Sequence, residues 1–394
     1  MNIGVFFGSK STEHDISIIT GVFICKQLQK LGYQVTPVYI DKDNNWIISD
    51  KLLDVSTYKD ESILNGLKKT IVKVNLTKSK CKMVLETNRI FTNKKIVIDL
   101  VFPAFHGING EDGSFQGMCE ILNVPYVGCG ILASAISINK VVTKLLYQRF
   151  NIPTTKFTYF QSQDWINNKE YIIKNISENL IFPVFVKPSR LGSSIGINKV
   201  KNVEDLENAI EIALAYDYMV LVEESVENLV DLTICLKGTY DNVTTSEIQE
   251  SKFNNEFFSY QDKYIDEGGT QFGNSENEDK IIIPANLDLE TYMQIKDTAI
   301  EIYKKFGCTG IARIDFLYDR QYKKFYANEI NTIPGTFYHH LWKKSGIDFS
   351  TVLNELINYA FEEYKSKNKL TYTFKSDVIN KSEKFSKKLE LSSV

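Results

Sequence analysis

Two segments near the C-terminal end of the sequence constrain the fold most. Residues 309–318 and 324–330 both have the composition of β-strands. The five residues between them, 319–323, are polar and suit a hairpin turn. The order therefore predicts two neighbouring strands joined by a tight connection.

Four side chains of this predicted hairpin fall on shared faces. Side chains alternate across a strand, so Arg313 points the same way as Asp315, and Glu329 the same way as Asn331. If the strands pair, one face gathers two carboxylates, an amide oxygen and a guanidinium. Three oxygen ligands of this kind suit Mg²⁺ that also holds the phosphates of a nucleotide. A solvated salt-bridge face is the alternative, and these residues alone do not decide between the two.

The bulk composition excludes several classes of protein. A length of 394 residues suits two or three domains, and 43% hydrophobic with 24% charged residues is ordinary for a globular protein. A net charge of −3 implies no broad basic surface, so neither nucleic acid nor a membrane is an expected partner. No apolar run approaches the roughly 20 residues that a membrane span needs.

The N-terminus and the cysteines indicate the compartment. The first ten residues open directly into a predicted strand and lack the basic start of a signal peptide. The cysteines are scattered and form no CxxC pair, which favours free thiols in a reducing cytoplasm over disulfides or a zinc site. They are Cys25, Cys81, Cys119, Cys129, Cys235 and Cys308.

The N-terminal region has the alternation of a parallel α/β sheet. Residues 2–7 predict a buried strand, and a small polar loop follows at 8–12. Apolar residues then recur at helical spacing over 16–31 and lead into a second strand at 35–40. After an irregular, strand-rich excursion, residues 96–103 predict another buried strand. This order favours a parallel sheet covered by helices.

Three domains are expected in all. An N-terminal α/β domain would span residues 1–125, a central domain 126–224 and a C-terminal domain 225–365. The central domain contains a predicted helix at 132–150 and a predicted strand at 184–188.

Two polar segments differ from the rest. Residues 250–281 have little periodicity and are too long for a passive connection, which is typical of a lid or binding loop. Residues 366–394 are rich in Lys and Ser, and we expect a mobile tail there.

A glycine-rich turn follows the predicted strand at 184–188. Lys187 would bring a positive charge to the end of that strand, and residues 192–196 contain two glycines and two serines. Glycines allow backbone N–H groups to approach a phosphate closely, and serines add donors. The segment matches neither a Walker A loop nor a Rossmann fingerprint. A plain glycine-rich hairpin is the alternative.

All four histidines lie in segments that follow predicted strands or turns. They are His14, His106, His339 and His340. Loops at the carboxyl ends of strands are where open α/β sheets bind ligands. A lone histidine is more often structural, and this is the alternative interpretation for each of the four.

Taken together, these motifs resemble the D-alanine–D-alanine ligase family of the ATP-grasp superfamily. Six motifs stand in the family's order over roughly residues 1–345, which is far more specific than any one of them. They are STEHDIS, HGINGEDGSFQG, VGCGILASAISINK, KPSRLGSSIG, ARIDF and NEINTIPG. The resemblance implies a three-domain ATP-grasp fold, in which an N-terminal parallel α/β domain precedes two α+β domains that clamp ATP.

The resemblance also implies an ATP site between the second and third domains. Lys140 and Lys187 would contact the phosphates, and Lys263 would approach them from the predicted lid. Asp231 would accept from the ribose. The residues assigned to ATP in this way are Lys140, Lys187, Ser194, Glu223, Glu224, Val226, Asp231 and Lys263.

Metal and substrate residues follow from the same resemblance. Asp315, Glu329 and Asn331 would bind one or two Mg²⁺ ions, with Mn²⁺ as an alternative. Glu13 would meet the ammonium group of the first amino acid, in a hydrogen-bonded trio with Ser193 and Tyr264. Arg313 and the backbone N–H of Gly335 would form an oxyanion hole. The remaining residues assigned to the amino-acid substrates are His106, His340 and Leu341.

The implied reaction is ATP-dependent ligation of a carboxylate to an amine. Phosphoryl transfer to the first amino acid would give an acyl phosphate, which the amine of the second would attack. D-alanyl-D-alanine for peptidoglycan is the expected product, with ADP and phosphate released. Two alternatives stay open: a relative that makes D-Ala–D-Ser or a secondary-metabolite dipeptide, and a nucleotide-binding protein without ligase activity. Relatives are often homodimers, but no interface pattern is evident in the sequence.

The chain departs from the family pattern at two places. Asn139 stands where an aspartate is usual. Residues 336–344 replace a run of small hydroxyl residues, with His340 in the place of a serine and without the usual proline. A neutral histidine could donate the same hydrogen bond, or the bulkier residues could narrow the pocket or select another acceptor. Tyr264, where ester-forming relatives have histidine, favours an amine acceptor.

Overall fold

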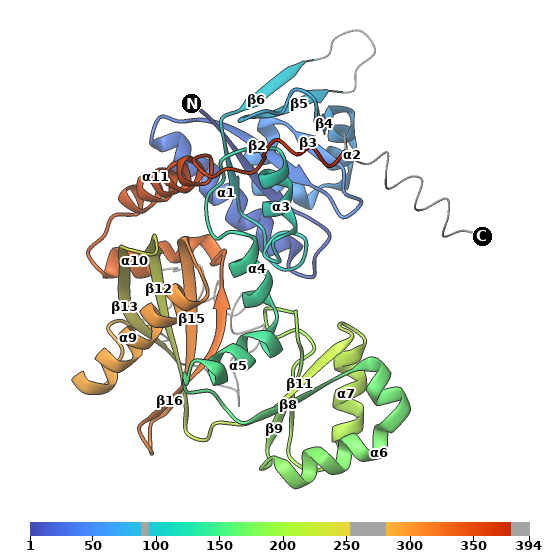
Figure 1. Cartoon of the computed structure of the whole chain (residues 1–394), viewed down its shortest axis with the longest axis vertical. Coiled ribbons are helices and arrows are strands. Elements are labelled where there is room, and N and C mark those ends of the chain that lie inside the picture. The colour runs from blue at the N-terminus through green and yellow to red at the C-terminus, as the bar shows by residue number, and fades with distance from the viewer. Residues whose placement is uncertain (88–93, 253–280, 380–394) are drawn as a thin grey trace.

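The computed structural model describes residues 1–87, 94–252 and 281–379. Within these ranges the strands form three sheets, of seven, four and five strands. Figure 1 shows the seven-stranded sheet at one end of the molecule and the two smaller sheets at the other. The predicted site residues Lys263 and Tyr264 lie outside the described residues.

The first sheet begins with the predicted β-loop-α-β unit. Strand β1 (Asn2–Gly8) pairs in parallel with β2 (Gln34–Ile40) on one side and with β7 (Leu100–Pro103) on the other. Helix α1 (His14–Lys30) connects β1 to β2 and buries Val22, Cys25 and Leu28 among others against them. The prediction of a parallel sheet at the N-terminus is therefore confirmed for these strands.

The irregular excursion extends this sheet with antiparallel strands, and short helices lie beside it. In chain order its elements are β3 (Trp46–Ile48), α2 (Glu61–Leu67), β4 (Ile71–Val74), β5 (Met83–Thr87) and β6 (Lys95–Ile98).

The predicted single strand at 96–103 is wrong. The chain bends at Asp99, so that β6 pairs with β5 at one edge of the sheet while β7 pairs with β1 at the other. Asn2 holds the bend: its N–H donates to the Asp99 carboxylate at 2.7 Å, and its side-chain amide donates to the Val97 carbonyl at 2.8 Å.

The second sheet positions the glycine-rich turn. Its antiparallel strands are β8 (Phe157–Gln161), β9 (Val184–Pro188), β10 (Asn198–Val200) and β11 (Met219–Glu224). Helices α6 (Ser162–Asn179) and α7 (Leu206–Leu214) provide apolar side chains to the same core as Val186 and Val222. Because side chains alternate, Lys187 and Glu223 point to the opposite face of the sheet.

The third sheet contains the predicted hairpin. Its strands are β12 (Leu229–Gly238), β13 (Val243–Ser251), β14 (Ile281–Ile282), β15 (Gly310–Asp319) and β16 (Lys324–Asn331), and α9 (Leu289–Lys305) packs against it. In the antiparallel pair β15–β16, Arg313 lies opposite Asn331 and Asp315 opposite Glu329. The alternate residue Ile314 is fully buried in the core, so the four polar side chains share the other face.

The predicted helix at 132–150 is two helices, α4 (Ile131–Ile138) and α5 (Lys140–Arg149). Asn139 between them has an extended backbone, with φ −94° and ψ 99°. Its side-chain oxygen accepts a hydrogen bond from the Val142 N–H at 3.1 Å, which caps the start of α5. Asparagine and aspartate are about equally good at this position, so the departure at Asn139 keeps the cap of α5.

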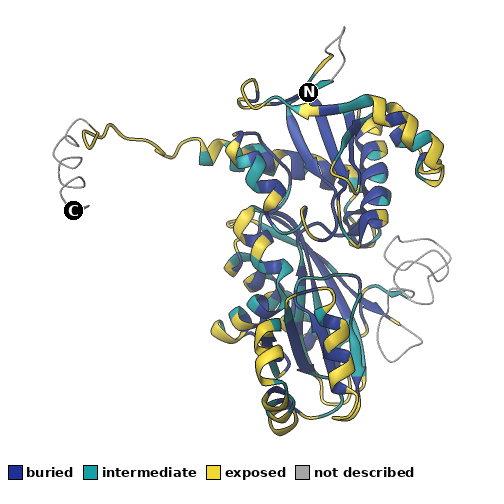
Figure 2. Ribbon diagram, turned by 90° about the vertical axis from the view of Figure 1, so that its right-hand side faces the viewer, coloured by how far each residue is buried: buried dark blue, intermediate teal, exposed yellow. Residues whose placement is uncertain are grey.

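The C-terminal helices return to the first domain. Residues of α10 (His339–Lys344) and α11 (Phe349–Lys367) share the core of the seven-stranded sheet, and α11 lies beside that sheet in Figure 1. The described part of the tail after α11 is exposed and leads away from the body of the protein (Figure 2). Among the described residues, no helix combines the length and apolar character required to cross a membrane.

Candidate active site

Two adjoining cavities gather most of the predicted site residues. The first lies between β9–β11 and β15–β16, and the second lies between the first domain, the glycine-rich turn and the segment after β16. Lys140, Arg313 and Glu329 line both cavities. The first is also lined by Lys187, Ser194, Glu223, Glu224, Val226, Asp231 and Asp315, and the second by Glu13, His106, Glu111, Ser193, Asn331 and Gly335.

The polar face of the hairpin forms the floor of the first cavity. Arg313 donates to the Asp315 carboxylate from Nε at 3.0 Å and from Nη2 at 2.7 Å, and its Nη2 lies 3.8 Å from Glu329. The Asn331 amide nitrogen donates to Asp315 at 3.2 Å. Lys140 lies 3.3 Å from the other oxygen of Glu329. These contacts hold the two carboxylates side by side.

The donor set on this face fits magnesium that is shared with a nucleotide. No group of three His, Cys, Asp or Glu side chains suited to a metal occurs in the described parts of the chain. Asp315, Glu329 and the amide of Asn331 would supply three oxygens, once the amide turns its oxygen inward. Mg²⁺ usually takes one or two carboxylates and fills its remaining positions with phosphate oxygens and water. The residues present therefore fit such an ion.

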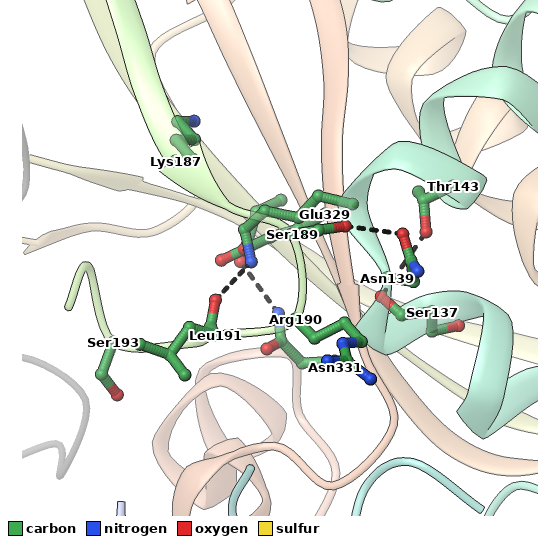
Figure 3. Close-up of polar contacts among 12 residues, drawn as sticks. Ser137, Asn139, Thr143, Lys187, Ser189, Arg190, Leu191, Ser193, Glu329 and Asn331 are labelled. Carbon is green, nitrogen blue, oxygen red and sulfur yellow. Dashed lines mark hydrogen bonds and ion pairs between the residues drawn. The ribbon is translucent and has the colours of Figure 1, made fainter. Parts of the chain in front are cut away.

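Two lysines line the first cavity, and a third lies behind its wall. Lys140, at the start of α5, donates to the Leu191 carbonyl at 2.6 Å, which ties the helix to the glycine-rich turn. Figure 3 shows Leu191 and Ser193 in this turn. Lys187, at the end of β9, lies 2.5 Å from Glu223 on β11. Lys144 contacts the same carboxylate from behind, at 2.6 Å. Lysine ammonium groups at the wall of such a cavity suit a polyphosphate.

The glycine-rich turn closes on Glu13. Ser193 and Ser194 have left-handed backbones, with φ 55° and 59°. The Ser193 hydroxyl donates to the carboxylate of Glu13, as predicted, although the two residues are 180 positions apart. A Cβ at Gly192 would lie 2.7 Å from one oxygen of Glu13 and 2.8 Å from the other, so this close approach requires glycine.

Two carboxyl groups, those of Glu13 and Glu111, line the second cavity. Burial, together with the neighbouring Glu13, raises the pKa of Glu111 to about 8. The Glu111 side chain accepts a hydrogen bond from the Gly107 N–H at 2.6 Å. Of the two, Glu13 is the carboxyl group predicted to meet the ammonium group of an amino acid.

His106 is a neutral wall of this cavity. Burial, with a smaller effect from Arg313, lowers the pKa of His106 to about 3. One ring nitrogen lies 2.9 Å from the Thr20 hydroxyl on α1. His106 therefore acts through hydrogen bonding and shape rather than through charge.

The segment after β16 folds tightly against Arg313. Thr336, Phe337 and Tyr338 all have left-handed backbones, with φ between 44° and 54°. The Tyr338 ring lies 5.1 Å from the Arg313 guanidinium carbon and also lines the first cavity. Gly335 lines the second cavity near Arg313, where the oxyanion hole is predicted.

His340 and Leu341 are placed differently from the other predicted residues. His340 lies 2.8 Å from the Gln249 side chain, and its ring is 5.1 Å from that of Tyr338. The Leu341 side chain is fully buried in the core, so only its backbone can meet a substrate. Neither residue is among those described above as lining the two cavities.

Four neighbours of the site were not predicted from the sequence: Lys144, Glu111, Tyr338 and Gln249. Glu111 lies within the motif HGINGEDG, five residues after His106, and this position could have marked it as a site residue. Tyr338 lies within residues 336–344, where the chain departs from the family pattern. Lys144 and Gln249 reach the site only through contacts distant in the sequence, so no local pattern marks them.

Comparisons with known proteins agree with this geometry. The family described as D-ala D-ala ligase N-terminus matches residues 2–129, and the one described as D-ala D-ala ligase C-terminus matches residues 146–358. A D-alanine–D-alanine ligase from Thermosipho melanesiensis is 40% identical, with 93% of this chain and 95% of the relative covered. One from Caldicellulosiruptor bescii is 38% identical, with 95% and 98% covered.

Solved structures give the same result. The VanG D-Ala:D-Ser ligase from Enterococcus faecalis has a TM-score of 0.74 at 31% identity, covering 91% of this chain and 99% of that one. The D-alanine–D-alanine ligase from Coxiella burnetii has a TM-score of 0.77 at 25% identity, covering 98% and 99%. The chain has the three-domain ATP-grasp fold and belongs to the D-alanine–D-alanine ligase family of ATP-dependent ligases.

Proposed function

We propose that this protein joins two molecules of D-alanine into D-alanyl-D-alanine for peptidoglycan, and converts ATP to ADP and phosphate. The observation that carries the proposal is the junction of the two cavities, which Lys140, Arg313 and Glu329 share. One cavity offers cations to a polyphosphate, and the other offers the Glu13 carboxylate to an ammonium group. A γ-phosphate and an amino-acid carboxylate can therefore meet at the junction.

The nucleotide residues fall into three groups in this proposal. Lys140 and Lys187 hold the phosphates. Glu223, Glu224 and Val226 meet the adenine, partly through backbone groups, and Asp231 accepts from the ribose. Ser194 is a further residue assigned to ATP. Lys263, outside the described residues, stays a prediction for the phosphates.

Asp315, Glu329 and Asn331 would hold one or two Mg²⁺ ions, with Mn²⁺ as an alternative. A bound ion neutralises phosphate charge, which makes the γ-phosphate a better target for a carboxylate. The support is the oxygen donor set on one face of the hairpin and its position beside Lys140.

Glu13 binds the ammonium group of the first D-alanine and leaves its carboxylate free to take the γ-phosphate as an acyl phosphate. Ser193 orients Glu13, and Tyr264 is the predicted third member of this set. The amine of the second D-alanine attacks the acyl carbon, and the oxygen of that carbon becomes an oxyanion. Arg313 and the Gly335 N–H stabilise this oxyanion until phosphate departs.

The second amino acid is the least constrained part of the proposal. The similarity to a D-Ala:D-Ser ligase and the departure at residues 336–344 support D-serine or another amino acid as a second candidate. His106, His340 and Leu341 are the residues assigned to this choice. His340 would act indirectly, because it contacts Gln249 and Tyr338.

Three further features belong to the proposal. We place the domain boundaries near residues 125, 224 and 365. The six free cysteines support a cytoplasmic location. A homodimer rests on the family resemblance alone, and light scattering after size-exclusion chromatography measures it.

Phosphate release with ATP and Mg²⁺, screened against pairs of D- and L-amino acids, tests the function. We expect D-alanine alone to stimulate release. If only a mixed pair of amino acids stimulated phosphate release, the second substrate would be an amino acid other than D-alanine. No phosphate release with any pair would contradict ligase activity.

A further inference from the structure

A fully buried lysine lies directly behind the first cavity. Lys144 follows Lys140 by one turn of α5, and its side chain is only 1% exposed. Its ammonium group lies 2.8 Å from the Thr154 hydroxyl, 2.8 Å from the Thr155 hydroxyl and 2.6 Å from the Glu223 carboxylate. An ammonium group has three hydrogens, so these partners use all of them. Lys144 has none left to offer a ligand.

Glu223 is held from two sides. Its Oε2 accepts hydrogen bonds from the Lys144 ammonium group and the Thr155 hydroxyl, while its Oε1 lies 2.5 Å from the Lys187 nitrogen. Its side chain is also 1% exposed. Glu223 and Lys187 are among the residues that line the first cavity, whereas Lys144 is on the far side of the carboxylate.

Burial alone would keep Glu223 protonated. Burial acts to raise the pKa of this carboxyl, but the charges of Lys144 and Lys187 hold it well below its ordinary value. The two lysines are expected to respond differently when a nucleotide binds. Lys187 is the one that turns to the phosphates in the proposed function, and Lys144 keeps its place.

We propose that Lys144 is a positioning residue that selects the nucleotide base. It keeps Glu223 ionised and fixes Oε2, so that Oε1 faces the cavity as a hydrogen-bond acceptor. An ionised carboxylate accepts and cannot donate. Where the site faces the C6 position of a purine, it therefore favours the amino group that adenine has there over the carbonyl oxygen that guanine has. This inference rests on the proposed function, because it takes the first cavity as the nucleotide site.

A purely structural ion pair between α5 and β11 is the competing explanation. Both explanations expect some loss of stability when Lys144 is replaced, because removing one partner leaves a buried charge. Only the positioning role expects a change in the choice between ATP and GTP. The test therefore compares nucleotides rather than stability alone.

The first experiment uses the full chain with Lys144→Met. Steady-state kinetics would give kcat and KM for ATP and GTP, and calorimetric titration would give the affinity for each nucleotide without turnover. We expect KM for ATP to rise about tenfold or more, the scale of one lost hydrogen bond to a charged group, with kcat changed much less. The preference for ATP over GTP should fall by a similar factor.

Lys174→Met is the matched control, because Lys174 on α6 is 70% exposed and pairs only loosely with Glu178 at 3.8 Å. We expect it to behave as the unchanged protein does. An unchanged ratio of ATP to GTP affinity in a folded Lys144→Met protein would overturn the positioning role.

Two further variants serve if Lys144→Met does not fold. Thr155→Val removes one contact to Oε2 and keeps both charges, so we expect a smaller loss of ATP preference. In a Glu223→Gln background the amide needs no counter-charge, so adding Lys144→Met should change ATP affinity little. A large loss of ATP affinity on adding Lys144→Met in this background would contradict the inference. Calorimetry also separates the two proposals: ATP binding without D-alanine-dependent turnover would contradict the ligase function but leave this test valid.

Discussion

Arg313 is held by Asp315, two residues along the same strand, through hydrogen bonds of 2.7 to 3.1 Å. The two residues are proposed for different tasks, since Arg313 would stabilise the oxyanion and Asp315 would bind metal. We infer that their contact couples those tasks. If Asp315 bound a metal ion, it would release the guanidinium of Arg313, which could then meet the reacting carbonyl.

Asp315→Asn should abolish turnover and preserve the fold. The amide keeps an oxygen that can accept from the buried Arg313, but it loses the charge that a metal requires. We expect kcat to fall at least about 100-fold, the scale of removing a group that stabilises transition-state charge. Coupled assays of ADP formation measure this change. Asp297→Asn on the exposed side of α9 is the control, and undiminished activity of Asp315→Asn would remove Asp315 from the metal site.

Gly192→Ala should weaken binding of the first amino acid. The added methyl would meet both oxygens of Glu13 at less than 3 Å, so the carboxylate must move. We expect KM for D-alanine at the first site to rise about tenfold, in the range for one lost charge-assisted hydrogen bond. Initial rates over a D-alanine series measure it.

Gly66→Ala is the matched control for this substitution. Gly66 lies in α2, and a Cβ there meets nothing within 4 Å. It should leave the kinetics unchanged and can raise stability slightly through helix propensity. An unaltered D-alanine KM in Gly192→Ala would argue against Glu13 as the ammonium site.

Glu111→Gln should change how stability depends on pH. The pKa of Glu111 is about 8 in the folded protein, above its ordinary value of 4.5, because of burial and the neighbouring Glu13. The protonated carboxyl therefore contributes stability that is fully present below pH 4.5. This contribution is lost as the pH rises to about 8, because the unfolded chain releases the proton first.

The glutamine side chain has no such proton to lose. The free energy of unfolding of the Glu111→Gln protein, relative to that of the unchanged protein, should therefore rise between pH 5 and 8. The gain is at most about 1.4 kcal/mol per pH unit. Thermal unfolding of both proteins at several pH values measures it. A constant difference between them across this range would contradict a neutral Glu111.

His340→Ser should act on the second amino acid more than on ATP. The substitution removes the contact to Gln249 and the ring beside Tyr338, which packs on Arg313. We expect KM for the second amino acid to change several-fold while KM for ATP stays nearly constant. Kinetics with D-alanine and D-serine as competing acceptors measure this change. If the variant and the unchanged protein have identical kinetics with these acceptors, His340 has no role in the choice of acceptor.

The sequence predicts those parts of the site that depend on local patterns, such as the alternation of side chains along a strand. The face shared by Arg313 and Asp315 follows from strand alternation, and the hairpin turn follows from its polar residues. The contact of Ser193 with Glu13 joins two domains, and it could be expected only from the family resemblance.

The missed features depend on contacts that no local pattern records. The break at Asn139 interrupts apolar residues that are continuous in sequence, because one cap outweighs propensity there. The bend at Asp99 depends on Asn2, nearly a hundred residues away. Lys144 reads as an ordinary helix lysine, and only β11 and the Thr154–Thr155 segment make it a buried ion.

The most direct test of the ligase function is the stoichiometry of the reaction. Full-length protein would be incubated with D-alanine, ATP and Mg²⁺, and ADP and dipeptide would be quantified by chromatography with mass detection. The account predicts one D-alanyl-D-alanine for each ADP, with neither product formed when D-alanine is omitted. ADP formation without dipeptide, or at a rate independent of D-alanine, would contradict it.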